Sequence, residues 1–146
     1  DGVARQGGGI PQLDPREITG AFAVARIEVV PVPLLHGRTP ILGFRFGDFA
    51  YLTDCNAVPD DSWALVRGVD TLVLDALRDK PHPTHSTVDR SLAYVQKLAP
   101  KQAYFTHIGH DLPHGRTEQL LPPNVRLAYD GLEMEIDIEI AEALPA

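Results

Sequence analysis

The chain has 146 residues, 44% of them hydrophobic, and a formal net charge of -7 at pH 7. This length and composition suit one domain with a sizeable core. The acidic balance provides no broad basic surface for the backbone of a long nucleic acid, and no apolar run approaches the roughly 20 residues that span a bilayer. The single cysteine excludes an internal disulfide, so a cytoplasmic location is the default expectation.

The first twenty residues show no hydrophobic periodicity and contain three consecutive glycines, Gly7 to Gly9. Such a stretch is typical of a loop rather than of the start of a domain. Because the chain begins at Asp1 rather than at a methionine, we expect residues 1–20 to be a loop that enters from a preceding segment.

Hydrophobic patterns predict a series of strands, two of which meet at the hairpin turn Gly47-Asp48 and two at Asp130-Gly131. Pro31 and Pro33 restrict the first strand to a sheet edge or a bulge. In chain order, the strands that we expect span residues 24–34, 41–47, 49–53, 71–74, 103–105, 125–129 and 134–140.

Three helical segments are expected between these strands. Pro59 and two acidic residues predict a short helix before Trp63. Ser86 is the expected N-cap of a longer helix, whose apolar positions 88, 92, 95 and 98 have helical spacing and which ends before Pro100. Residues 120–121 close a third, short segment, and the alternation predicts an α/β protein.

Three of the predicted strands end in a residue that can bind a metal ion: His36, Asp54 and His107. Ligands at strand ends are held rigidly at one rim of a sheet, as a metal site requires. Any one of these residues alone is better interpreted as a turn or loop-cap residue. Together, in a chain with only six histidines, they favour a metal site.

The order of short motifs is more specific than these single residues. Leu-Thr-Asp at 52–54, His-Ser-Thr at 85–87 and Thr-His-Ile at 106–108 resemble the phosphodiesterase branch of the metallo-β-lactamase superfamily. With His36-Gly37 before them and Tyr-Asp-Gly at 129–131 after them, they are similar to the second half of ribonuclease Z and of phosphoribosyl cyclic phosphate phosphodiesterases. The resemblance covers about residues 7–136.

The resemblance implies a fold and a set of roles. Residues 1–146 would form the C-terminal half of one four-layer αββα domain, with a mixed sheet and flanking helices. His36 would bind one of two divalent metal ions, zinc or manganese, His107 the other, and Asp54 would bridge both. A carboxylate has two oxygens to share between cations, whereas one imidazole nitrogen binds one metal. His85 would be catalytic, facing the scissile phosphate to hold an oxygen or protonate the leaving group.

The sequence departs from the family pattern at one point. Family members carry a His-x-His-x-Asp-His cluster in the first half of the fold, and no such cluster occurs here. The pair His82 and His85 has the wrong spacing and lacks the acidic residue. We therefore expect an N-terminal half to supply the remaining ligands, and this chain alone to be inactive.

Other candidate residues have simpler expectations. Cys55 is expected to be a small packing residue, and His110 and His114 to be solvated loop residues. His82, next to two prolines, is expected to be a structural residue; the alternative is that Asp75 and His82 orient the true ligands by contacting them from outside.

The leading hypothesis is a metal-dependent hydrolase, a dinuclear phosphodiesterase whose partner is a small cyclic phosphate or nucleotide phosphodiester. No membrane or long nucleic acid is expected as a partner, and a homodimer is left open. One alternative is a non-catalytic half-domain that functions only with a partner chain or a second copy. Another is a lactonase or thioesterase on the same scaffold. A His-x-His-x-Asp-His run upstream of Asp1 would distinguish the enzyme from the half-domain.

Overall fold

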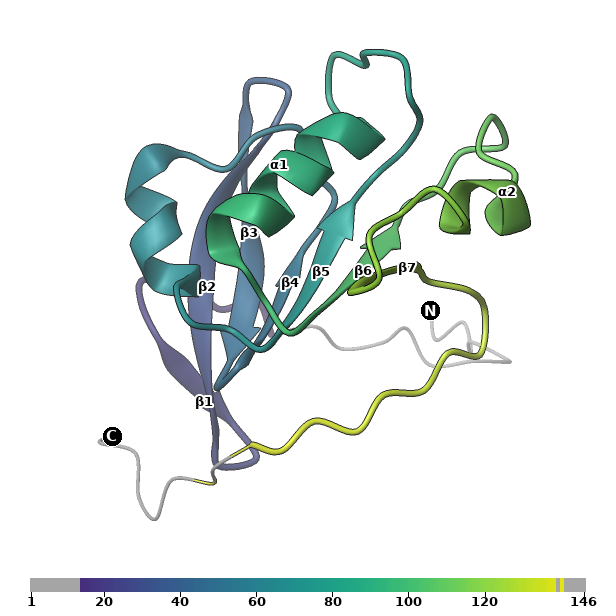
Figure 1. The fold of residues 1–146 in the computed structure, drawn as a ribbon. Coiled ribbons are helices and arrows are strands. Elements are labelled where there is room, and N and C mark those ends of the chain that lie inside the picture. Colours follow the sequence, from purple (N-terminus) through teal and green to yellow (C-terminus); the bar gives the residue numbers. More distant parts are fainter. Residues whose placement is uncertain (1–13, 139, 141–146) are drawn as a thin grey trace, which may run out of the picture.

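The computed structural model describes residues 14–138 and residue 140. These residues form a seven-stranded sheet in which the strands lie side by side in chain order (Figure 1). The strands are β1 Phe22–Val24, β2 Ile27–His36, β3 Thr39–Phe46, β4 Phe49–Leu52, β5 Thr71–Asp75, β6 Gln102–Thr106 and β7 Val125–Leu127. The helices are the 3-10 helix η1 Asp60–Val66, and the α-helices α1 Val88–Leu98 and α2 His114–Glu118.

The sheet changes its pairing at β4. The pairs from β1 to β4 are antiparallel, and the pairs from β4 to β7 are parallel. Parallel neighbours need crossover connections, which here contain η1, α1 and α2. In consequence the carboxyl ends of β4, β5 and β6 meet at one edge of the sheet.

The hydrophobic core lies between the sheet and the helices η1 and α1, which cover one of its faces (Figure 1). Leu52, Leu74, Phe105 and Leu127 are register partners across four parallel strands, and each is at most 1% exposed. Alternation along each strand sends the intervening residues to the opposite face. Tyr51, on that opposite face, is 41% exposed.

Most of the expected elements are confirmed. Pro31 and Pro33 lie in the part of β2 that pairs with β3 on one side and, among the described residues, with no strand on the other. This is the edge position that was expected. The expected N-cap was wrong by one residue: Thr87, not Ser86, accepts a hydrogen bond from the Arg90 amide at 3.2 Å. The segment expected to close at residues 120–121 is α2, which already ends at Glu118.

The expected final pair of strands was wrong. β7 ends at Leu127, and residues 132–138 form no strand, with no ladder partner in the described part of the chain. Residue 139, within the second expected strand, lies outside the described residues. The segment instead runs back across the molecule toward the β3–β4 turn (Figure 1), where a Cβ on Gly47 would lie 3.9 Å from Ile138 Cγ2. Alternating polarity favours an extended chain, but a strand also needs a free edge to pair with.

Within the described residues, no helix combines the length and the apolar character needed to cross a bilayer. Residues 14–20 contain no helix or strand, in agreement with the expected loop, whereas residues 1–13 of that loop lie outside the described residues.

Candidate metal centre

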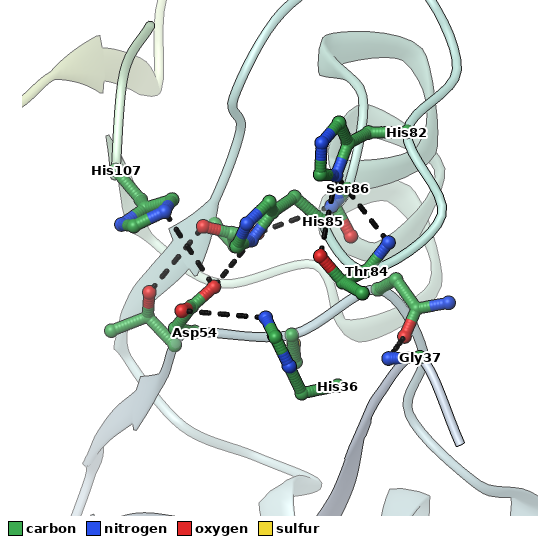
Figure 2. A network of polar contacts seen from close by, with 12 residues as sticks. His36, Gly37, Asp54, His82, Thr84, His85, Ser86 and His107 are labelled. Carbon is green, nitrogen blue, oxygen red and sulfur yellow. Dashed lines mark hydrogen bonds and ion pairs between the residues drawn. The ribbon is translucent and has the colours of Figure 1, made fainter. Parts of the chain in front are cut away.

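Five parts of the chain bring titratable side chains together at the carboxyl edge of the sheet (Figure 2). His36 ends β2, Asp54 follows β4 by two residues, and His107 directly follows β6. Asp75 is the last residue of β5, and His85 comes from the loop between β5 and α1. The parallel register of β4, β5 and β6 brings these strand ends to the same edge.

The Asp54 carboxylate lies between histidines, with its two oxygens directed to different rings (Figure 2). Asp54 Oδ2 is 3.7 Å from His36 Nε2, and Oδ1 is 3.7 Å from His107 Nε2. Ligand atoms that share one tetrahedral zinc ion lie roughly 3.4 Å apart when each bond is about 2.1 Å long. Each of the two spacings is therefore close to that of two atoms that bind the same cation.

His85 makes the shortest contact with Asp54. Its Nδ1 lies 2.5 Å from Asp54 Oδ1, and both atoms are buried and make no hydrogen bond of regular geometry within the described residues. A buried nitrogen and a buried oxygen this close require a proton or a cation to offset the repulsion of their lone pairs. The nitrogen and oxygen donors here suit zinc or manganese. The residues present therefore fit a divalent metal ion.

The group of possible ligand atoms is not identical to the predicted one. Asp54, Asp75, His85 and His107 each offer an atom within 4.8 Å of the others, whereas His36 lies outside this group and contacts Asp54 from the other side. The structure thus brings all four predicted site residues together, with His85 nearer to Asp54 than either predicted histidine ligand. The division of roles between ligand and acid remains a prediction.

Asp75 has a larger part in this site than the sequence indicated. Its side chain is fully buried, 3.5 Å from His85 Nδ1 through Oδ2. The same oxygen accepts a hydrogen bond from the Ser86 amide at 3.1 Å, and Oδ1 accepts one from the Thr53 hydroxyl at 3.5 Å. Burial raises the pKa of the Asp75 carboxyl above its usual range, while the Ser86 amide and His107 oppose this rise. Its place at the end of a buried strand was the available sequence signal.

His107 has an unusual backbone conformation. Its φ is 56°, in the left-handed region that non-glycine residues seldom occupy. Such a conformation costs of order 1–3 kcal/mol and is typically found where the surrounding structure enforces it at a functional site. It turns the chain sharply after β6, so that His107 Nε2 faces Asp54.

Three imidazole rings surround that of His85, with His82 stacked on it, His107 tilted and His36 edge-on. The His85 ring centroid is 4.6 Å from those of His82 and His107 and 5.0 Å from that of His36. Partial burial, reinforced by the neighbouring His85, lowers the pKa of His82. His82 Nδ1 accepts a hydrogen bond from the Thr84 amide at 3.4 Å. His82 therefore contacts the site through His85.

The remaining candidates belong to no group of possible metal ligands among the described residues. His110, 98% exposed, pairs with Asp111, and His114, the first residue of α2 rather than a loop residue, pairs with Glu118. The Cys55 thiol is buried and donates to the Leu52 carbonyl at 3.6 Å. Burial, with smaller contributions from Asp75 and Asp54, raises the pKa of Cys55 to about 12, so the thiol stays protonated as expected of a packing residue.

Comparison with known proteins establishes the class. The family described as the β-lactamase superfamily domain matches residues 3–108. The chain belongs to the metallo-β-lactamase superfamily, in agreement with the resemblance seen in its motifs.

Two solved structures are similar to the chain to different degrees. A diphosphatase from the PhnP family is 49% identical, with a TM-score of 0.84, over 87% of this chain and 50% of that chain. The short form of human tRNase Z, 23% identical with a TM-score of 0.60, shares the fold over 80% of this chain and 46% of that chain. The described residues thus form part of the metallo-β-lactamase fold and span about half of these structures.

One curated protein, described as an octanoyltransferase from Porphyromonas gingivalis, is 33% identical over 118 residues. The match covers 80% of this chain but 24% of that protein.

Proposed function

We propose that the complete protein is a metal-dependent phosphodiesterase with two divalent ions in its active site. The observation that carries the proposal is the Asp54 carboxylate, whose two oxygens face His36 and His107 at the same distance of 3.7 Å. Such a carboxylate suits a bridging position, and two-metal sites recur among enzymes that cleave phosphate esters.

His36, Asp54 and His107 would hold the ions, with further ligands expected from the half of the domain outside this chain. Zinc or manganese bound there would stabilise negative charge on the attacking and leaving oxygens of a phosphoryl group. The site lies at an exposed rim, since the Asp54 side chain is 43% exposed, so a small substrate can reach it.

His85 is the proposed proton donor. Its ring is packed between His82 and His107 and contacts the buried carboxylate of Asp75 through Nδ1. These contacts fix the ring orientation and leave Nε2 as the nitrogen able to meet a leaving group. A positioned imidazole typically contributes about 10² to 10⁴ to the rate as a general acid.

The substrate is proposed to be a small cyclic phosphate or nucleotide phosphodiester. The net charge of -7 provides no broad basic surface for a polynucleotide, whereas a small phosphodiester needs only the local field of the metal centre. A second candidate is a diphosphate anhydride, because the related structure that is 49% identical is described as a diphosphatase.

A substrate panel tests the proposal. The complete protein is freed of metal with a chelator, reloaded with zinc or manganese, and assayed on a five-membered cyclic phosphodiester, a nucleotide diphosphate, a lactone and a thioester. Metal-dependent turnover of the cyclic phosphodiester above the others supports the proposal. Preference for the nucleotide diphosphate supports the second candidate. Turnover of the lactone or thioester alone, or of no compound, contradicts both.

A further inference from the structure

One residue outside the candidate ligand set contacts the backbone on both sides of His36. The backbone amide of Asn56 donates a hydrogen bond to the Leu35 carbonyl at 2.9 Å. The side-chain oxygen of Asn56, Oδ1, accepts a hydrogen bond from the Gly37 backbone amide at 2.7 Å. The two peptide groups that flank His36 are therefore both held by Asn56. Asn56 also follows Asp54 by two residues, so it joins the strand end of His36 to the segment of Asp54.

The turn that follows His36 explains why this clamp is needed. Gly37 has a φ of +66°, in the left-handed region, as the chain turns from β2 into β3. A partly buried amide in such a turn requires an acceptor, and the Asn56 side chain supplies it. Without that acceptor, the Gly37 end of the turn would be free to shift, and the His36 ring with it.

Asn56 is itself fixed from the opposite side. The Arg90 guanidinium of α1 donates to the Asn56 carbonyl at 2.7 Å, and the next residue, Ala57, forms a bridge with Leu35. The Ser86 amide, adjacent to His85, donates to the Cys55 carbonyl at 3.0 Å. Asn56 thus lies in a segment anchored to α1 and to the His85 loop, and it transmits that anchoring to His36.

We propose that Asn56 is a positioning residue that sets His36 against Asp54 and so fixes the metal position between these two side chains. The proposal rests on the two-metal centre proposed above. Asn56 does not touch the metal: it acts through the backbone of His36. Partners that orient a metal ligand from outside typically change metal affinity about 10- to 100-fold when they are removed.

The test measures metal affinity in the complete protein by competition between the metal-free protein and a chromophoric chelator for zinc. Asn56→Ala is expected to weaken one of two zinc affinities by about 10- to 100-fold and to change the other less. Asn56→Asp retains an acceptor oxygen for the Gly37 amide and should recover most of the loss. The matched control is Asn124→Ala, since the Asn124 side chain also bonds the backbone of a distant residue, donating to the Pro100 carbonyl at 3.2 Å. This control should bind zinc as the unmodified protein does.

A double variant separates positioning from general loosening of the fold. If Asn56 acts through His36, Asn56→Ala should have no further effect on zinc affinity in a His36→Ala background. Unchanged affinities in Asn56→Ala, or the same additional loss in that background, would overturn the proposal. An unmodified protein that does not bind two zinc ions would contradict the metal centre itself, and with it this inference.

Discussion

At the scale of single residues, both His85 and His107 are placed so that they could bind a metal ion. Both lie in the group of possible ligands, and both face Asp54 Oδ1. The two side chains are held in place in different ways. His107 is fixed by its own strand and turn, whereas His85 belongs to a loop and contacts the buried Asp75. These differences favour His107 as a ligand and His85 as a proton donor.

Alanine substitutions distinguish the two roles. His107→Ala should lower metal occupancy and turnover together, because a ligand is lost. His85→Ala should retain the metal and lower turnover by about 10² to 10⁴. The measurement is metal content beside phosphodiester turnover in the complete protein. On an ester with a p-nitrophenolate leaving group the His85→Ala defect should shrink, since that group hardly needs a proton. Loss of metal from His85→Ala would mean that the roles must be exchanged.

The sequence indicated most of this site because each of four residues ends a recognisable strand or begins a recognisable motif. The importance of Asp75 could not be judged in the same way. Its contact with His85 depends on the parallel register of β5 and β6 and on the path of the loop that carries His85. The sequence did not indicate a role for Asn56, because that role arises from two contacts with the backbone on either side of His36, which is distant in the sequence.

At the scale of the elements, β3 is closely packed at Gly43. A Cβ there would lie 2.8 Å from Leu34 Cδ1 and 2.9 Å from both Leu52 Cδ2 and the Tyr51 carbonyl oxygen. Gly43→Ala should therefore lower the free energy of unfolding by about 1–3 kcal/mol, as overpacking typically does. Thermal unfolding of the complete protein measures this loss.

Gly115, in α2, provides the matched control. A Cβ on Gly115 would meet no atom within 4 Å. Gly115→Ala should leave stability unchanged or raise it slightly, because alanine favours a helix over glycine. Equal melting temperatures for the two variants would show that β3 adjusts to the added methyl group.

Local sequence patterns are sufficient to predict some of the elements. The apolar runs predicted the core strands, and the helical spacing of apolar residues together with Pro100 predicted α1. The segment of residues 132–138 has the same alternation as a strand but finds no partner edge among the described residues. Pairing is a property of the whole sheet, so the local pattern could not determine it.

At the scale of the whole molecule, one face of the sheet is covered by helices and the other is partly exposed. η1 and α1 cover the face that contains the buried core (Figure 1). On the other face Tyr51 is 41% exposed, and Tyr104, its neighbour through Val73, is partly exposed. The chain also spans about half of its solved relatives. We expect the other half of the domain to cover this face and to supply the metal ligands that this sequence lacks.

The central prediction is that Asp54 is shared by two metal ions, and metal content per chain tests it most directly. In the complete protein, purified in the presence of zinc and then dialysed, we expect two ions. His36→Ala and His107→Ala should each retain about one ion, because each removes a ligand from a different ion. Asp54→Ala should retain none, because both ions lose a ligand and then repel each other without the carboxylate between them. An Asp54→Ala protein that keeps two ions and normal turnover would contradict the account.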